Sequence, residues 1–95
     1  MNKKEIPSGV YRHYKGKEYD IYGTVILAGT EDANEPVYQV IYRPRYGAKL
    51  ATSRELNEFL GVVSVNATSC SRFLFVREFN DDEADAQILA HMLSA

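Results

Sequence analysis

Alternating apolar and polar positions predict three strands in the first half of the chain. Residues 10–14 are rich in β-branched and aromatic side chains, and residues 19–27 carry apolar or aromatic side chains at every second position. Gly16 lies in the short turn between them and can adopt a positive φ, so the two strands should form an antiparallel hairpin. Gly23 inside the second strand indicates a bulge. After a polar loop, residues 37–43 form a third strand with apolar side chains on both faces.

The middle of the chain predicts short strands and a short helix. Residues 50–51 can form a fourth strand. Residues 52–55 have the sequence Thr-Ser-Arg-Glu, which fits a capping box that satisfies free backbone N–H groups. A helix should therefore run over about residues 53–60. Residues 62–65 are apolar enough for another strand, whereas the small polar residues 66–71 predict a loop.

The end of the chain predicts a strand followed by a helix. Residues 72–79 alternate, with Phe73 and Phe75 on one face, and we expect this face to be buried. Residues 80–83, with the sequence Asn-Asp-Asp-Glu, form a second capping box with acidic side chains that favour the helix dipole. Apolar side chains then recur at helical spacing, and this stripe should cover apolar surface of the chain itself or of a partner. The stripe consists of Ala84, Ile88, Leu89 and Met92.

This order of elements predicts a mainly β protein with a minor helical part. The chain has 95 residues, of which 45% are hydrophobic, so it is long enough for one domain with a single core. We expect a flexible lead-in over residues 1–8, a β domain over residues 9–79 and a C-terminal helix over residues 80–95.

Charge and cysteine content narrow the class of protein. The formal net charge is −2, so the whole molecule is not a general binder of polyanions, and there is no strong nucleic-acid signal. A single cysteine allows no intramolecular disulfide and fits a reducing compartment. No apolar run approaches the ~20 residues of a membrane span, and the charged N-terminus lacks the apolar region of a signal peptide. We therefore expect a cytoplasmic protein that has no membrane partner.

Cations and aromatic side chains gather at two places, which makes them the best candidates for a binding site. One group lies at the end of the predicted hairpin, and the other lies in the loop after the third strand. If the fold brings them together, they can hold a phosphate, a carboxylate or a nucleic-acid backbone. The alternative is that the cations are solvated surface charges and the tyrosines belong to the core. The candidate residues are Arg12, His13, Tyr14, Lys15, Arg43, Arg45 and Tyr46.

No set of residues points to catalysis or to a metal. His13 can serve as a general base, but a single histidine in a strand is more often a hydrogen-bonded structural residue. Cys70 has no base beside it in the sequence. Two histidines and one cysteine give no zinc spacing, and the acidic residues follow no calcium-loop order. The sequence therefore predicts no catalytic residues, no metal site and no cofactor.

The opening of the chain carries a distinctive motif, Gly-Val-Tyr-Arg-His-Tyr-Lys-Gly, at residues 9–16. This motif is similar to the block with which members of a bacterial family, the domain of unknown function 1653, begin. Later segments resemble the family in the same order: Pro-Val-Tyr-Gln-Val-Ile-Tyr at residues 36–42, the helical segment at residues 50–59, and the pair Arg72 and Phe73.

The implications of the resemblance concern the fold. It implies a small β domain similar to SH3-type barrels, here a partly open SH3-like barrel over residues 9–79. The C-terminal helix lies outside the family pattern. Three family features are absent. Leu-Ala-Gly-Thr-Glu-Asp at residues 27–32 replaces a His-Ser-Glu-Thr run, Ala51 stands at the place of a Trp, and the Arg-Pro pair that follows this Trp is missing. The resemblance implies no activity.

Two functions remain open from the sequence. The first is a non-catalytic binding module that recognises an anionic or extended ligand through the hairpin and the basic loop. The alternative is a protein–protein interaction module, in which a homodimer forms through the C-terminal helix or an open strand edge. An enzyme ranks last. Arg12 bears on this choice, because a guanidinium within a strand needs a planar partner, and we expect a carboxylate of the chain itself rather than a ligand.

Overall fold

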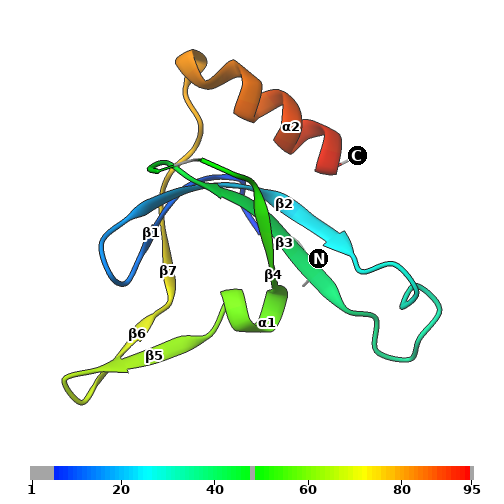
Figure 1. Ribbon diagram of the computed structural model, residues 1–95, viewed down its shortest axis with the longest axis horizontal. Coiled ribbons are helices and arrows are strands. Elements are labelled where there is room, and N and C mark those ends of the chain that lie inside the picture. The colour runs from blue at the N-terminus through cyan, green and yellow to red at the C-terminus, as the bar shows by residue number, and fades with distance from the viewer. Residues whose placement is uncertain (1–5, 48, 95) are drawn as a thin grey trace.

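A five-stranded antiparallel sheet forms the centre of the molecule (Figure 1). The structure is a computed structural model that describes residues 6–47 and 49–94. The strands lie in the order β4-β3-β2-β1-β7, so β4 and β7 form the two edges. The strands of this sheet are β1 (Gly9–His13), β2 (Glu18–Ile26), β3 (Tyr38–Pro44), β4 (Thr52–Glu55) and β7 (Phe73–Arg77).

Further elements cover both faces of the sheet. In Figure 1, the helix α2 (Ala84–Ser94) lies above the sheet, whereas α1 (Leu56–Phe59) and a two-stranded ribbon lie below it. The ribbon consists of β5 (Val62–Val65) and β6 (Thr68–Ser71), and a short 3₁₀ turn, η1 (Asp81–Glu83), leads into α2. The prediction of a mainly β fold with minor helix is confirmed. The described strands form no closed barrel, and the likeness to SH3-type barrels stays a prediction.

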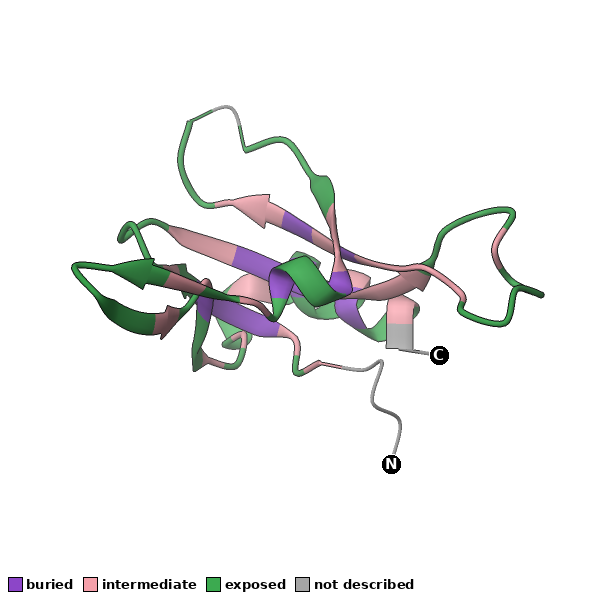
Figure 2. Cartoon of the chain, turned by 90° about the horizontal axis from the view of Figure 1, so that it is seen from below, coloured by how far each residue is buried: buried purple, intermediate pink, exposed green. Residues whose placement is uncertain are grey.

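The main core lies between the sheet and α1. Phe59 of α1 stacks on Phe73 of β7, with ring centroids 4.4 Å apart and an angle of 11° between the planes. Figure 2 shows that buried positions gather on the central strands and on α1, while much of the β5–β6 ribbon is exposed. Burial of these side chains is the main source of stability for a chain of this size. The buried cluster consists of Tyr11, Ile21, Val40, Tyr42, Leu56, Phe59 and Phe73.

The helix α2 packs on the sheet through small side chains rather than through the predicted stripe. Ala86 and Ala90 are buried, whereas Ile88 and Met92 are 59% and 66% exposed. The predicted inner face was therefore wrong in part, because Ala84 is exposed like Ile88 and Met92, whereas Leu89 is half-buried. Gly23 of β2 allows α2 to lie close to the sheet, since a Cβ at this position would lie 3.2 Å from the Cβ of Leu93. The predicted bulge at Gly23 is confirmed by a shift in the pairing of β2 with β3.

The first predicted helix begins later than the sequence pattern indicated. Residues 52–55 form the edge strand β4, which pairs with β3, so the strand predicted at residues 50–51 is also misplaced. Glu55 rather than Thr52 caps α1, and its carboxylate accepts hydrogen bonds from the backbone N–H groups of Asn57 and Glu58 at 2.9 and 3.1 Å. Pairing with β3 satisfies the backbone of residues 52–55, and this outweighs the local capping signal.

Two predictions about the late strands were wrong in part. Residues 66–71 are not all loop, because β6 occupies Thr68–Ser71 and pairs with β5. Phe73 is buried as expected, but Phe75 is 41% exposed because it lies on the edge strand β7, where its ring contacts that of Tyr11. The capping box at residues 80–83 is confirmed, with Asn80 and Glu83 in the expected roles.

Contacts of Gly9 and of residues 6–8 fix the start of β1. A Cβ on Gly9 would lie 2.4 Å from the carbonyl oxygen of Arg77, so β1 and β7 approach closely only because this residue is glycine. Most of the predicted lead-in, residues 1–5, lies outside the described residues. Within residues 6–8, Ile6 packs against the core and the Pro7 carbonyl accepts a 2.6 Å hydrogen bond from the hydroxyl of Tyr11.

Candidate functional site

The predicted cationic and aromatic residues divide between the two faces of the sheet. Successive side chains of a strand point to opposite faces. On β2, Tyr19 faces the side of α1, where its ring meets Tyr46, whereas Asp20 faces α2 and binds Arg45. The loop after β3 repeats this division, since Arg45 and Tyr46 are neighbours in sequence. The single patch predicted from the sequence is therefore two separate sites.

The first site is a surface of aromatic rings that we call the ring surface; it comprises His13, Tyr14, Tyr19, Tyr46 and Phe73. The His13 ring centroid lies 4.5 Å from that of Tyr14, 5.0 Å from that of Phe73 and 6.0 Å from that of Tyr19. The hydroxyl groups of Tyr19 and Tyr46 share a hydrogen bond of 2.7 Å. Phe73 is buried beneath the surface, while Tyr14 and Tyr46 remain 37% and 41% exposed. The core therefore holds the inner ring in place, and the outer rings face solvent.

Cations border the ring surface. The ammonium groups of Lys15 and Lys17 lie 5.8 and 5.1 Å from the centroids of the Tyr14 and Tyr46 rings, and the guanidinium of Arg54 lies 5.8 Å from that of Phe73. These separations are typical of cation–π contacts.

The positive charges around His13 are only partly compensated by carboxylates. Glu58 binds Arg54. Within residues 6–47 and 49–94, neither lysine of the hairpin turn nor Arg72 forms an ion pair. The environment of the ring surface is therefore positive.

His13 is held as a neutral donor. Burial, followed by the charges of Arg54, Arg72 and Lys15, lowers the pKa of His13 below its usual 6.5. The backbone N–H of Lys15 donates to Nδ1 of His13 at 3.2 Å, so in the neutral ring the proton lies on Nε2. The ring surface thus presents N–H and O–H donors together with cations. Burial and the hydrogen bond with Tyr46 also raise the pKa of Tyr19 to about 12, which keeps its phenol protonated.

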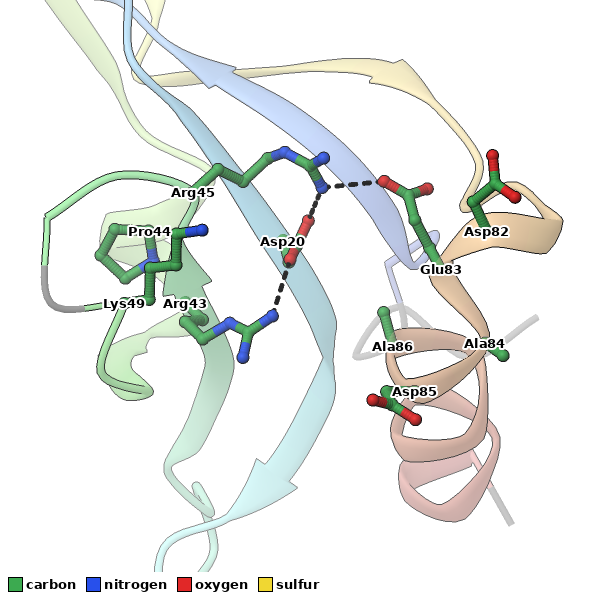
Figure 3. Close-up of a pocket in the computed structure, with 10 residues that line it drawn as sticks. All are labelled: Asp20, Arg43, Pro44, Arg45, Lys49, Asp82, Glu83, Ala84, Asp85 and Ala86. Carbon is green, nitrogen blue, oxygen red and sulfur yellow. Dashed lines mark hydrogen bonds and ion pairs between the residues drawn. The ribbon is translucent and has the colours of Figure 1, made fainter.

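The second site, which we call the charged pocket, is a cavity of about 340 Å³ between the β3–β4 loop and the start of α2 (Figure 3). Cationic side chains from β3 and its loop line one wall, and carboxylates from η1 and α2 line the other. Asp20 lies between the two arginines. The lining residues are Asp20, Arg43, Pro44, Arg45, Lys49, Asp82, Glu83, Ala84, Asp85 and Ala86.

Ion pairs cross the inner part of the charged pocket. Asp20, 4% exposed, accepts from Arg43 Nη2 at 3.4 Å and from Arg45. Arg45 also reaches Glu83 at 2.9 Å, and Glu83 binds Arg77 with contacts of 2.8 and 3.1 Å. The hydrogen bonds from Arg77 and from the backbone of Asn80, together with Arg45, lower the pKa of Glu83 to about 2. This chain of charges joins the start of α2 to the sheet.

The structure places the predicted site residues in three settings. His13, Tyr14, Lys15 and Tyr46 come together at the ring surface. The side chains of Arg43 and Arg45 lie across the sheet in the charged pocket. Arg12 faces away from His13 and pairs with Glu18 at 3.3 Å, which agrees with the expected internal partner, although both side chains are substantially exposed.

The described residues contain no group of three or more His, Cys, Asp and Glu side chains arranged to hold a metal. No helix among them is long and apolar enough to span a membrane.

Comparison with known proteins gives a family. Residues 9–75 match the family described as "Protein of unknown function (DUF1653)". The chain belongs to the DUF1653 family. It is similar to the crystal structure of a DUF1653 protein from Bordetella bronchiseptica, with 30% sequence identity and a TM-score of 0.62 over 79% of this chain and 92% of that one. No curated protein matches this chain significantly.

The match assigns the two sites to different parts of the DUF1653 chain. All residues of the ring surface lie within residues 9–75. The acidic wall of the charged pocket lies after residue 75, in η1 and α2. The ring surface therefore belongs to the family region, whereas the pocket needs the C-terminal helix.

Sequence reasoning missed several residues of these sites. Phe73 and Arg54 were assigned to the core and to a capping box, and only strand pairing brings them to His13. Asp20 was the one available signal, because an acidic residue inside an apolar strand needs a cationic partner when it is buried.

Proposed function

We propose that this DUF1653 protein is a non-catalytic binding module that recognises an anionic ligand through the ring surface. The observation that carries this proposal is the combination of partly exposed rings with three cations that form no ion pair with any residue the structure describes. Lys15, Lys17 and Arg72 surround His13, Tyr14 and Tyr46. Such a surface favours a ligand that combines negative charge with a flat or extended group, as in a phosphate attached to a planar ring.

The donors of the ring surface support an oxyanion rather than a cation. His13 offers Nε2–H, the tyrosines offer hydroxyl groups, and Lys15 and Lys17 offer ammonium groups. A cationic ligand would meet the positive charges of Lys15, Lys17 and Arg72, and Glu58 already binds Arg54.

A non-catalytic role fits the same site. A nucleophile needs a base within hydrogen-bond reach and a group that orients the base. The backbone N–H of Lys15 already donates to Nδ1 of His13. The rings and cations of the ring surface can contact a ligand, but they do not form a nucleophile with its base.

A titration followed by NMR tests the proposal. Inorganic phosphate and a short single-stranded oligothymidylate would be added to the labelled protein. We expect saturable shifts at His13 and Tyr19, tighter binding of the oligonucleotide, and a rise in the pKa of His13 because a bound anion stabilises the imidazolium. Tyr14→Ala should weaken oligonucleotide binding about tenfold, since one base–ring stack is worth about 1–3 kcal/mol.

The opposite face provides the matched control. Lys15→Met should weaken phosphate binding, whereas Lys49→Met, which removes the same charge from the charged pocket, should not. Equal losses in both variants, or shifts confined to the charged pocket, would contradict the proposal.

Homo-oligomerisation is a second candidate, favoured by one observation. The edge strand β7 carries three consecutive exposed apolar residues, Leu74, Phe75 and Val76, whereas the other edge, β4, is polar. An apolar edge is prone to pairing with another strand. Sedimentation at rising protein concentration tests it, with Leu74→Glu expected to abolish any dimer and Ser53→Glu on β4 to leave it unchanged.

A further inference from the structure

The charged pocket has two walls of opposite sign, and its inner charges are already paired. Asp20 and Glu83 bind Arg43, Arg45 and Arg77. These pairs fix the walls in place and leave the outer charges to solvent. What the pocket can bind therefore depends on the charges at its rim.

The rim carries charges without partners on both sides. On the acidic wall, Asp82 and Asp85 are exposed and form no ion pair with any described residue. On the cationic wall, the ammonium of Lys49 also lacks an ion pair within residues 6–47 and 49–94. Arg43 keeps 42% of its side chain exposed, and its Nη2 reaches Asp20 only at 3.4 Å.

The backbone of Lys49 is also unusual. Its φ is 57°, in the left-handed region that residues other than glycine seldom adopt, and Asn66 and Ala67 in the turn between β5 and β6 share this region. Such conformations persist where the surrounding structure holds them, and they occur frequently at binding sites. Here the conformation belongs to the residue that supplies the free ammonium group of the pocket.

We propose that the charged pocket binds a small dipolar molecule, with a carboxylate held by Lys49 and Arg43 and an ammonium group held by Asp85. A simple anion would meet the carboxylates of the far wall, and a simple cation would meet the lysine and arginines. A molecule with both charges at opposite ends satisfies both walls. The volume of about 340 Å³ lies at the lower end of the range for ligand sites, which suits a dipeptide with free termini.

Glycylglycine and two blocked analogues test this proposal directly. N-acetylglycylglycine lacks the ammonium group, and glycylglycinamide lacks the carboxylate, while all three share the same core. We expect glycylglycine to shift the amide resonances of residues that line the pocket in a saturable way. Each analogue should bind about tenfold more weakly, because each loses charge-assisted hydrogen bonds to one wall.

Matched variants assign the binding to the two walls. Lys49→Met and Asp85→Asn should each weaken glycylglycine binding about tenfold. The controls are Lys17→Met in the hairpin turn and Asp81→Asn, which belongs to the same acidic run but does not line the pocket. All four side chains are exposed, and thermal unfolding would establish that each variant is folded.

Three results would overturn the proposal. The first is the absence of a saturable shift up to the solubility limit of glycylglycine, and the second is equal binding of the blocked analogues. The third is an equal loss in the variants and the controls, which would mean that overall charge governs the interaction. If a variant fails to fold, the comparison of the three peptides with the parent chain still decides the matter.

Discussion

The ring surface and the charged pocket lie on opposite faces of the same strands, yet they are held together by different forces. The ring surface rests on the core through Phe73, which stacks on Phe59 and is buried. The charged pocket rests on ion pairs around Asp20 and Glu83. Tyr19 and Asp20 are neighbours on β2, and the side chain of Tyr19 belongs to the ring surface whereas that of Asp20 belongs to the charged pocket.

The two sites should therefore respond differently to salt and to pH. Stacking of Phe73 on Phe59 depends little on salt or pH, whereas paired charges at a partly exposed site respond to both. The core beneath the ring surface should therefore be lost only when the fold is damaged. The charged pocket should open under acid, which leaves the sheet intact.

Phe73→Ala gives the largest expected effect and tests whether the ring surface depends on the core. Removing a buried phenylalanine leaves a cavity and should cost about 3–5 kcal/mol of unfolding free energy. Phe75→Ala is the matched change on the same strand, and because Phe75 is 41% exposed, it should cost less than about 2 kcal/mol. Urea unfolding of the two variants provides the measurement. Equal losses would mean that Phe73 has no special place beneath the rings.

Asp20→Asn tests the other side of the comparison. Removing one partner of a fully buried ion pair costs about 3–5 kcal/mol. Arg43 and Arg45 keep 42% and 33% of their side chains exposed, so we expect a smaller loss of about 2 kcal/mol. Glu18→Gln, which removes the exposed partner of Arg12, is the control, and its cost should stay below about 1 kcal/mol. If both variants unfold at the same urea concentration, the pairs of the pocket are no stronger than a surface contact.

Acid should act on the charged pocket at a lower pH than it acts on His13. The pKa of His13 in the folded state lies below its usual 6.5, so His13 lowers the stability as the pH falls below 6.5. The pKa of Glu83 is lowered to about 2 from its ordinary 4.5, so the folded state prefers the ionised carboxylate. Its contribution to stability is complete above pH 4.5 and is lost as the pH falls toward 2. We expect the melting temperature of the parent chain to fall across this interval.

Two variants assign this acid response to one residue. Glu83→Gln should have a lower melting temperature at neutral pH and a weaker dependence on pH between 4.5 and 2. Asp81→Asn should keep the dependence of the parent chain. An unchanged pH profile in Glu83→Gln would show that the contact of Glu83 with Arg77 and Arg45 does not stabilise α2.

The sequence predicted the elements of this fold better than the arrangement of its sites. Alternation in β1, β2 and β3 is a local property, and so is the capping box at residues 80–83. Residues 52–55 show the limit of local signals, because their capping pattern yielded to pairing with β3. Phe75 shows a second limit, since an edge position cannot be recognised from alternation alone.

The sequence itself indicates that the predicted patch divides between two faces of the sheet. Tyr19 and Asp20, and likewise Arg45 and Tyr46, are neighbours, and neighbours in extended chain point to opposite sides. The partner of each side chain could not be predicted, because it depends on strand order and register. Glu83 illustrates this, since its contact with Arg45 joins η1 to the loop after β3.

Arg12→Lys gives the smallest expected effect and tests the separation of the two faces. Arg12 pairs with Glu18 at 3.3 Å, but the two side chains are 52% and 38% exposed, so the pair is screened by water. A lysine can replace a single contact of this kind, and we expect a change below about 0.5 kcal/mol in unfolding free energy. Phosphate binding at the ring surface should also be unchanged, because Arg12 and His13 point to opposite faces of β1. A loss of stability above about 1 kcal/mol would mean that the guanidinium has a bidentate role that lysine cannot fill. Weaker phosphate binding with unchanged stability would place Arg12 at the ring surface, and the two faces would then not act separately.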